Sequence, residues 1–260
     1  MKKFTLMMLF TSLLVILPLG AEGQTETSEQ ASGQQKSYLA SNTWTAAFAE
    51  LGGLDNVYNL APANLVHPPE YELTPSDIQK LSQCHLFIYA GYEVMMKTLG
   101  DSTIPQEKMV QITTTNDLET VQMMADKIAK IANTEEVSTE RVAQYKKVIE
   151  EGRAMVKKLG LDTLSVYCNF HQKDIAEDLG LHVQGVFGPG PITPVQIKEV
   201  AKNNYDLIID NIHNPLSSPL AEISPKSKVV SWRNFPEDIN PNSLADMESE
   251  NFKMLANLYQ

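Results

Sequence analysis

Short apolar runs alternate with amphipathic stretches from residue 37 to residue 258. In the first half the apolar runs lie at 37–40, 56–60, 85–90 and 110–113, and in the second at 164–168, 183–187, 207–210 and 229–231. Runs this short predict buried strands of parallel sheet. Helical spacing of apolar residues lies between them, at 43–51, 75–82, 94–99, 118–132, 172–179, from 194 onward, and at 244–258. The pattern predicts an α/β fold of two lobes, each a mostly parallel sheet with flanking helices.

One amphipathic stretch, residues 138–159, is longer than the others. Its apolar stripe is formed by Val142, Tyr145, Ile149, Met155, Val156 and Leu159. An acid in its first turn and two lysines in its last turn match the helix dipole. A helix of about 21 residues spans about 30 Å, the length of a small lobe. We therefore expect one long rigid helix to join an N-terminal lobe, residues 37–137, to a C-terminal lobe, residues 160–260.

The first 36 residues have the composition of a targeting segment and a tether. Lys2 and Lys3 precede the apolar run 4–19, and Gly20-Ala21 follows it, which predicts a signal peptide over residues 1–22. An uncleaved N-terminal anchor is the alternative, although the run is short for a membrane-spanning helix. Residues 23–36 are rich in Gln, Ser, Thr, Glu and Gly and predict a flexible tether. The chain is expected to be secreted across the cytoplasmic membrane, into a periplasmic or other extracytoplasmic compartment.

Charge and cysteine content narrow the classes of partner. The formal net charge of −11 argues against nucleic acid and against an anionic membrane surface. The two cysteines, Cys84 and Cys168, fall in strands expected in different lobes. We therefore favour two free thiols over one disulfide. A monomer is expected.

Several polar side chains directly follow predicted strands or lie on the loops between elements. These candidates are His67, Glu93, Asn169, His171 and His213. Ligands of parallel α/β lobes bind at the carboxyl ends of strands, so these side chains are expected to face a cleft between the lobes. His67 lies on a short loop before a helix start, where Thr74 can be the N-cap, Pro75 the first helical residue and Asp77 the capping-box acid.

The stretch His67-Pro68-Pro69-Glu70-Tyr71-Glu72, which runs into Thr74-Pro75-Ser76-Asp77, resembles the first metal-binding motif of the zinc and manganese solute-binding proteins of ABC importers. The segments 77–91 and 176–189, the latter containing Gly185-Val186-Phe187-Gly188-Pro189, are similar to further stretches of that family. The resemblance implies a non-enzymatic receptor that captures a divalent metal between its lobes and delivers it to a membrane permease.

The chain departs from that family at three of the four ligand positions. Where the family has a second histidine, this chain has residues 112–117, without one. The family's third ligand position falls on Asn169, two residues before His171. The position of the family's fourth ligand, a late aspartate, falls in residues 231–236. This segment contains no acidic residue, and the first one after it is Glu237. Only His67 transfers from the resemblance.

Other residues of this chain can replace the missing ligands. The predicted metal ligands are His67, His171 and His213, with Glu93 or Asp210 supplying a carboxylate. Asn169 and Tyr92 are predicted to hold the imidazoles in orientation. A shell rich in imidazole favours zinc, and one richer in oxygen favours manganese, so zinc is favoured over manganese.

Three alternatives stay open at this point. The missing second histidine and the aromatic residues Tyr92, Phe170 and Trp232 are compatible with a chelated metal or a small organic ligand. A metal-dependent hydrolase is disfavoured because no His-Glu-x-x-His, Gly-x-Ser-x-Gly or phosphate-loop motif is present. A surface adhesin would leave no sequence mark of its own.

Overall fold

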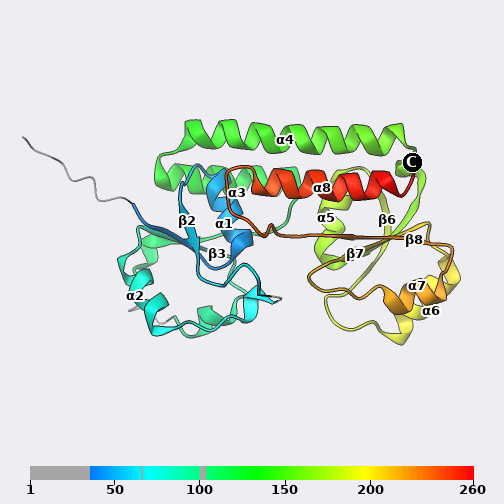
Figure 1. Cartoon of the computed structure of the whole chain (residues 1–260), viewed down its shortest axis with the longest axis horizontal. Coiled ribbons are helices and arrows are strands. Elements are labelled where there is room, and N and C mark those ends of the chain that lie inside the picture. Colours follow the sequence, from blue (N-terminus) through cyan, green and yellow to red (C-terminus); the bar gives the residue numbers. More distant parts are fainter. Residues whose placement is uncertain (1–35, 66, 100–103) are drawn as a thin grey trace, which may run out of the picture. The chain divides into compact units, whose positions relative to one another are not determined.

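The computed structural model describes residues 36–65, 67–99 and 104–260, and these contain two four-stranded sheets in which every strand is parallel to its neighbours. The first sheet has the order β2-β1-β3-β4 and consists of β1 (Tyr38–Ala40), β2 (Val57–Asn59), β3 (Leu86–Tyr89) and β4 (Met109–Gln111). The second has the order β6-β5-β7-β8 and consists of β5 (Ser165–Asn169), β6 (His182–Phe187), β7 (Leu207–Asn211) and β8 (Lys228–Trp232). The predicted α/β fold class is confirmed (Figure 1).

Eight α-helices connect or follow these strands within the described residues. They are α1 (Thr43–Leu51), α2 (Pro75–Gln83), α3 (Leu118–Ala132), α4 (Glu135–Lys158), α5 (Lys173–Asp178), α6 (Pro194–Asn203), α7 (Ser218–Ile223) and α8 (Ser243–Asn257). Short 3-10 turns include η1 (Pro68–Glu70), η2 (Val94–Lys97), η3 (Gln106–Lys108), η4 (Leu161–Thr163) and η5 (Phe170–Gln172).

The structure differs from the predicted helices in three places. The helix expected over 94–99 is the 3-10 turn η2. The long helix α4 begins at Glu135 rather than at 138, because Glu135 and Glu136 suit the positive end of the helix dipole. The short helix α7 has Pro219 in its first turn and lies in a segment for which we predicted no helix.

One hydrophobic core extends under both sheets. It contains residues of α1, α3 and α4 together with strands of each sheet, and the nine residues of α1 are all buried. Helix α8 packs along α4 and against β8, and it also contacts α1 (Figure 1). The long helix is therefore supported by a second helix that touches elements of both halves.

A buried polar network crosses between the halves. Asn116, just before α3, donates its Nδ2 to the carbonyl of Asn234 at 3.0 Å and to Oε1 of Glu248 at 2.7 Å. Its Oδ1 accepts the indole N–H of Trp44 at 2.8 Å. The other oxygen of Glu248 accepts from Asn251 at 3.0 Å. Because Asn116 contacts groups of α1, α8 and the loop after β8, it fixes the junction beside the strand ends.

The remaining sequence predictions concern the two cysteines and the N-terminal segment. Cys84 and Cys168 are buried as free thiols, in separate hydrophobic clusters. The signal peptide and nearly all of the tether, residues 1–35, lie outside the described residues. Among the described residues, no helix combines the length and the apolar character needed to cross a membrane.

Candidate functional site

A cavity of about 840 Å³ lies at the carboxyl ends of both parallel sheets. From the first half it is lined by Asn42, Trp44, His67, Pro68, Pro69, Glu70, Ala90, Tyr92, Gln111, Ile112, Thr113, Thr114, Thr115, Met124 and Lys127. From the second half it is lined by Phe170, His171, Asp174, Pro189, Asn211, His213, Asn214, Asn234 and Phe235. The three predicted histidine ligands therefore line a single cavity, from loops far apart in the sequence.

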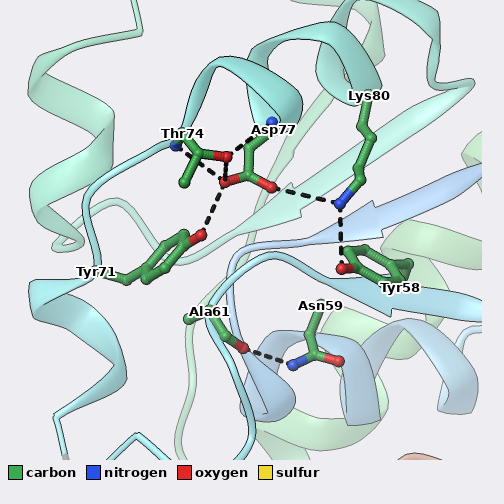
Figure 2. A network of polar contacts seen from close by, with 7 residues as sticks. All are labelled: Tyr58, Asn59, Ala61, Tyr71, Thr74, Asp77 and Lys80. Carbon is green, nitrogen blue, oxygen red and sulfur yellow. Dashed lines mark hydrogen bonds and ion pairs between the residues drawn. The ribbon is translucent and has the colours of Figure 1, made fainter.

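The loop that carries His67 is anchored by the start of α2. Thr74 and Asp77 form the predicted capping box, and the Asp77 carboxylate also accepts the hydroxyl of Tyr71 at 2.8 Å (Figure 2). Burial alone would raise the pKa of Asp77, but hydrogen bonds from Thr74 and Tyr71 and the ammonium of Lys80 hold it below its ordinary value. The chain between His67 and α2 is thus tied to a rigid helix end, while His67 itself is exposed at the cavity.

The two histidines of the second half are positioned by the same local device. Strands β5 and β7 each end in an asparagine, and the histidine lies two residues later. Oδ1 of Asn169 accepts the backbone N–H of His171 at 3.1 Å, and Oδ1 of Asn211 accepts the backbone N–H of His213 at 3.0 Å. Since β5 and β7 are neighbours in the sheet, these two Asn-x-His turns place both histidines at one edge.

The imidazole of His213 is fixed in orientation. Its Nδ1 lies 2.8 Å from Oδ1 of Asn234, and its ring stacks on Phe235 with centroids 3.6 Å apart. Because an amide oxygen only accepts, Nδ1 carries the proton and Nε2 presents its lone pair. Burial, with a smaller contribution from Arg233, lowers the pKa of His213 despite the opposing effect of Asn234. The neutral ring with a free Nε2 is the form that binds metals.

His171 is also held in its neutral form. Burial lowers its pKa from the ordinary value. Its ring lies edge-on to Phe170, with centroids 5.5 Å apart. Asn169 positions the backbone of His171 rather than its ring, which differs from the role predicted for it.

The two predicted carboxylate ligands do not line the cavity. Both are about 1 % exposed. The Glu93 carboxylate accepts the backbone N–H groups of Ala90 and Gly91 and the hydroxyl of Ser41. The positive φ of Gly91, 102°, turns the following chain so that the Glu93 carboxylate comes back to the N–H of Gly91.

Asp210 is used in the same way in the second half. Its carboxylate accepts the backbone N–H groups of Asn211, Leu216 and Ser217, at 2.8 to 3.2 Å, and the side-chain amide of Asn169 at 3.3 Å. It therefore braces the loop that carries His213 and links it to the first Asn-x-His turn. The prediction that Glu93 or Asp210 supplies a ligand is replaced by a role in holding the loops.

The polar residues of the cavity that sequence reasoning missed include Glu70, Asp174, Lys127 and Asn234. Glu70 lies three residues after His67, in the 3-10 turn η1, and Asp174 lies three residues after His171, in the first turn of α5. That spacing was available in the sequence. Tyr92, which was predicted, also lines the cavity and hydrogen-bonds Thr114 at 3.1 Å between the two hydroxyls.

The candidate ligands do not yet surround one point. Within residues 36–65, 67–99 and 104–260, no group of three or more His, Cys, Asp or Glu side chains is close enough to hold a metal ion. The cavity thus gathers metal-binding side chains along its walls without forming a finished coordination shell.

Comparison with known proteins identifies the fold. No family model matches the sequence, and no curated protein matches it. Among solved structures, the Ni²⁺ complex of the SBP FpvC from Pseudomonas aeruginosa is similar over 87 % of this chain and 97 % of that chain, with a TM-score of 0.68 and 14 % identity. The Mn-bound and Cd-bound periplasmic metal binding protein from Candidatus Liberibacter asiaticus is similar over 87 % of this chain and all of that chain, with a TM-score of 0.67 and 14 % identity. This chain therefore shares the two-lobed α/β fold of these two proteins.

Proposed function

We propose that the chain is an extracytoplasmic solute-binding protein that captures a divalent transition metal in this cavity and delivers it to an ABC permease. The observation that carries the proposal is the single cavity lined by His67, His171 and His213 at the carboxyl ends of two parallel sheets. The similar structures of proteins described with Ni²⁺, Mn and Cd support the metal class. The signal peptide predicted for residues 1–22 supports export.

The donor set favours zinc over manganese. Neutral imidazoles bind zinc readily, and burial lowers the pKa values of both His171 and His213. A carboxylate can come from Asp174 or Glu70, which line the cavity, in place of Glu93 and Asp210. The protein ligands are therefore expected among the three histidines and these two acids. Binding requires those that coordinate the metal to approach a common ion.

Metal binding should raise the melting temperature of the protein after chelator stripping. Zinc at 100 times its dissociation constant stabilises the folded state by about 2.7 kcal/mol, which is roughly 5–10 °C for a chain of this size. Manganese should give a smaller shift at the same concentration. Differential scanning calorimetry measures both, and the absence of a shift with either metal would contradict the proposal.

His213→Ala should weaken zinc binding by roughly 100-fold or more, because it removes the best-oriented imidazole. The matched control is His182→Ala, since His182 is exposed at the start of β6, away from the strand ends that form the cavity. Isothermal titration calorimetry compares the two variants. Equal loss in both would assign the zinc binding to surface histidines in general.

Asn234→Ala should weaken zinc binding by about 10- to 100-fold, because the His213 ring loses the acceptor that fixes its Nδ1 proton. Asn234→Asp keeps an acceptor at the same place and should stay within a few-fold of the parent protein. Titration of both variants with zinc tests this. An unchanged affinity in Asn234→Ala would mean that Phe235 alone holds the ring.

A further inference from the structure

The cavity is far larger than a metal ion needs. With Zn–N distances of about 2.0 Å, an ion out to its donor atoms fills a sphere on the order of 35 Å³. The cavity measures about 840 Å³, which lies in the range of sites for small organic ligands. Most of this space is therefore available to something other than the ion.

The histidines leave coordination positions open. They line one cavity, yet no three potential ligand side chains among the described residues come together around one point. An ion held by one or two imidazoles would keep several positions for donors that the protein does not supply. Such positions are filled by water or by the donor atoms of a second molecule.

Aromatic side chains of both halves present uncovered surface in the cavity. Tyr92 from the first half is 51 % exposed and Phe170 from the second is 53 % exposed, although both line the cavity. Phe170 lies beside His171 in the sequence, and their rings meet edge to face. A planar molecule bound to a metal at His171 would find the Phe170 ring next to it, with a gain from aromatic contact.

The charges that line the cavity are of both signs. Glu70 and Asp174 follow the candidate histidines, where a cation is expected. Lys127, on α3, donates one hydrogen bond to the carbonyl of Gln111, at 2.7 Å. Its ammonium has two further N–H groups that can donate to a ligand. An ammonium at the wall suits the carboxylate of an organic molecule rather than a metal ion.

We propose that the natural ligand is a divalent metal chelate, in which a small planar chelator with carboxylate groups accompanies the ion. An imidazole of His171 or His213 coordinates the metal, Tyr92 and Phe170 contact the planar part, and Lys127 faces a carboxylate. The inference rests on the proposed metal-receptor function and specifies the form in which the metal arrives.

Three chelators in equimolar complex with zinc separate the features of the ligand. Pyridine-2,6-dicarboxylate is planar and anionic, citrate is anionic but not planar, and 2,2′-bipyridine is planar but uncharged. The full chain, stripped of metal, is titrated with each complex and with zinc alone, and native mass spectrometry records whether zinc and chelator bind together. The dicarboxylate complex is expected to bind at least tenfold more tightly than zinc alone and than the other two complexes.

Variants test the contacts. Tyr92→Ala and Phe170→Ala should each weaken binding of the dicarboxylate complex by roughly tenfold more than they weaken binding of zinc alone. Tyr92→Phe, which keeps the ring, should retain binding. Tyr58→Ala is the control, because Tyr58 is 50 % exposed but does not line the cavity.

The outcomes are distinguishable. If zinc alone binds as tightly as every complex and the aromatic variants are unchanged, the chelate inference is overturned and the metal receptor stands. If bipyridine or citrate binds best, the planar anionic chelator is overturned. If neither zinc, manganese nor nickel binds, alone or chelated, the proposed function falls as well.

Discussion

Asp210→Ala should lower the free energy of unfolding by about 3–5 kcal/mol, although Asp210 does not line the cavity. The side chain is about 1 % exposed and accepts the backbone N–H groups of Asn211, Leu216 and Ser217. Its removal leaves these buried donors and the amide of Asn169 without their acceptor. Each buried donor that loses its partner costs about 1–3 kcal/mol, partly recovered where water enters. Urea denaturation measures the change.

Asp210→Asn separates charge from shape in this loop. It keeps one oxygen acceptor but turns an NH₂ group toward backbone donors, so we expect about half the loss seen with alanine. Asp238→Asn is the control, because Asp238 is exposed and a substitution there should change stability by less than about 0.5 kcal/mol. A loss below about 1 kcal/mol in Asp210→Ala would show that the 211–217 loop finds other hydrogen-bond partners.

The second large expected effect is that the free energy of unfolding depends on pH because of Glu248. Burial raises the pKa of its carboxyl from 4.5 to about 7, against the lowering effect of the hydrogen bonds from Asn251 and Asn116. Between pH 4.5 and 7 the folded state therefore binds more protons than the unfolded state, so stability falls as pH rises through this window and is constant above it. A pKa difference of this size corresponds to about 3 kcal/mol.

Glu248→Gln removes the titration while keeping the shape of the side chain. The stability of the parent protein relative to this variant should fall by about 3 kcal/mol from pH 4.5 to pH 8. Glu250→Gln, an exposed residue of the same helix, should show no such trend. Denaturant titrations at the two pH values measure it. Parallel pH profiles for the parent and Glu248→Gln would mean that the two amide donors keep Glu248 ionised throughout.

Local sequence signals predicted most of the elements because the elements depend on local interactions. The capping box of Thr74 and Asp77 formed as expected, and Thr193 at the start of α6 forms another. The apolar runs formed parallel strands, and β3, β5 and β7 are almost wholly buried, as expected for such runs. The residues 94–97 failed as a helix, since the preceding Glu93 uses its carboxylate to hold Ala90 and Gly91 instead of capping the turn.

The site was predicted less completely. Three predicted ligands, His67, His171 and His213, line the cavity. His171 and His213 were proposed because residues after parallel strands meet at one edge of a sheet, a rule that needs only the strand ends. His67 was proposed mainly because its loop resembles a metal-binding motif. The carboxylates were misjudged because the same rule does not say which way a side chain turns. Asp210 and Glu93 occupy strand-end positions, yet each turns toward backbone N–H groups of its own loop.

By itself, the sequence determined the α/β alternation, the long helix and the histidines at the strand ends, because periodicity, caps and spacing act over a few residues. Only the tertiary structure decided the rest. It turned the buried acids toward the backbone of their loops and brought Asn234 to His213 across 21 residues. It also gave the cavity its volume of about 840 Å³ and its aromatic walls. These outcomes depend on hydrogen bonds and packing between segments distant in the chain, which no local pattern encodes.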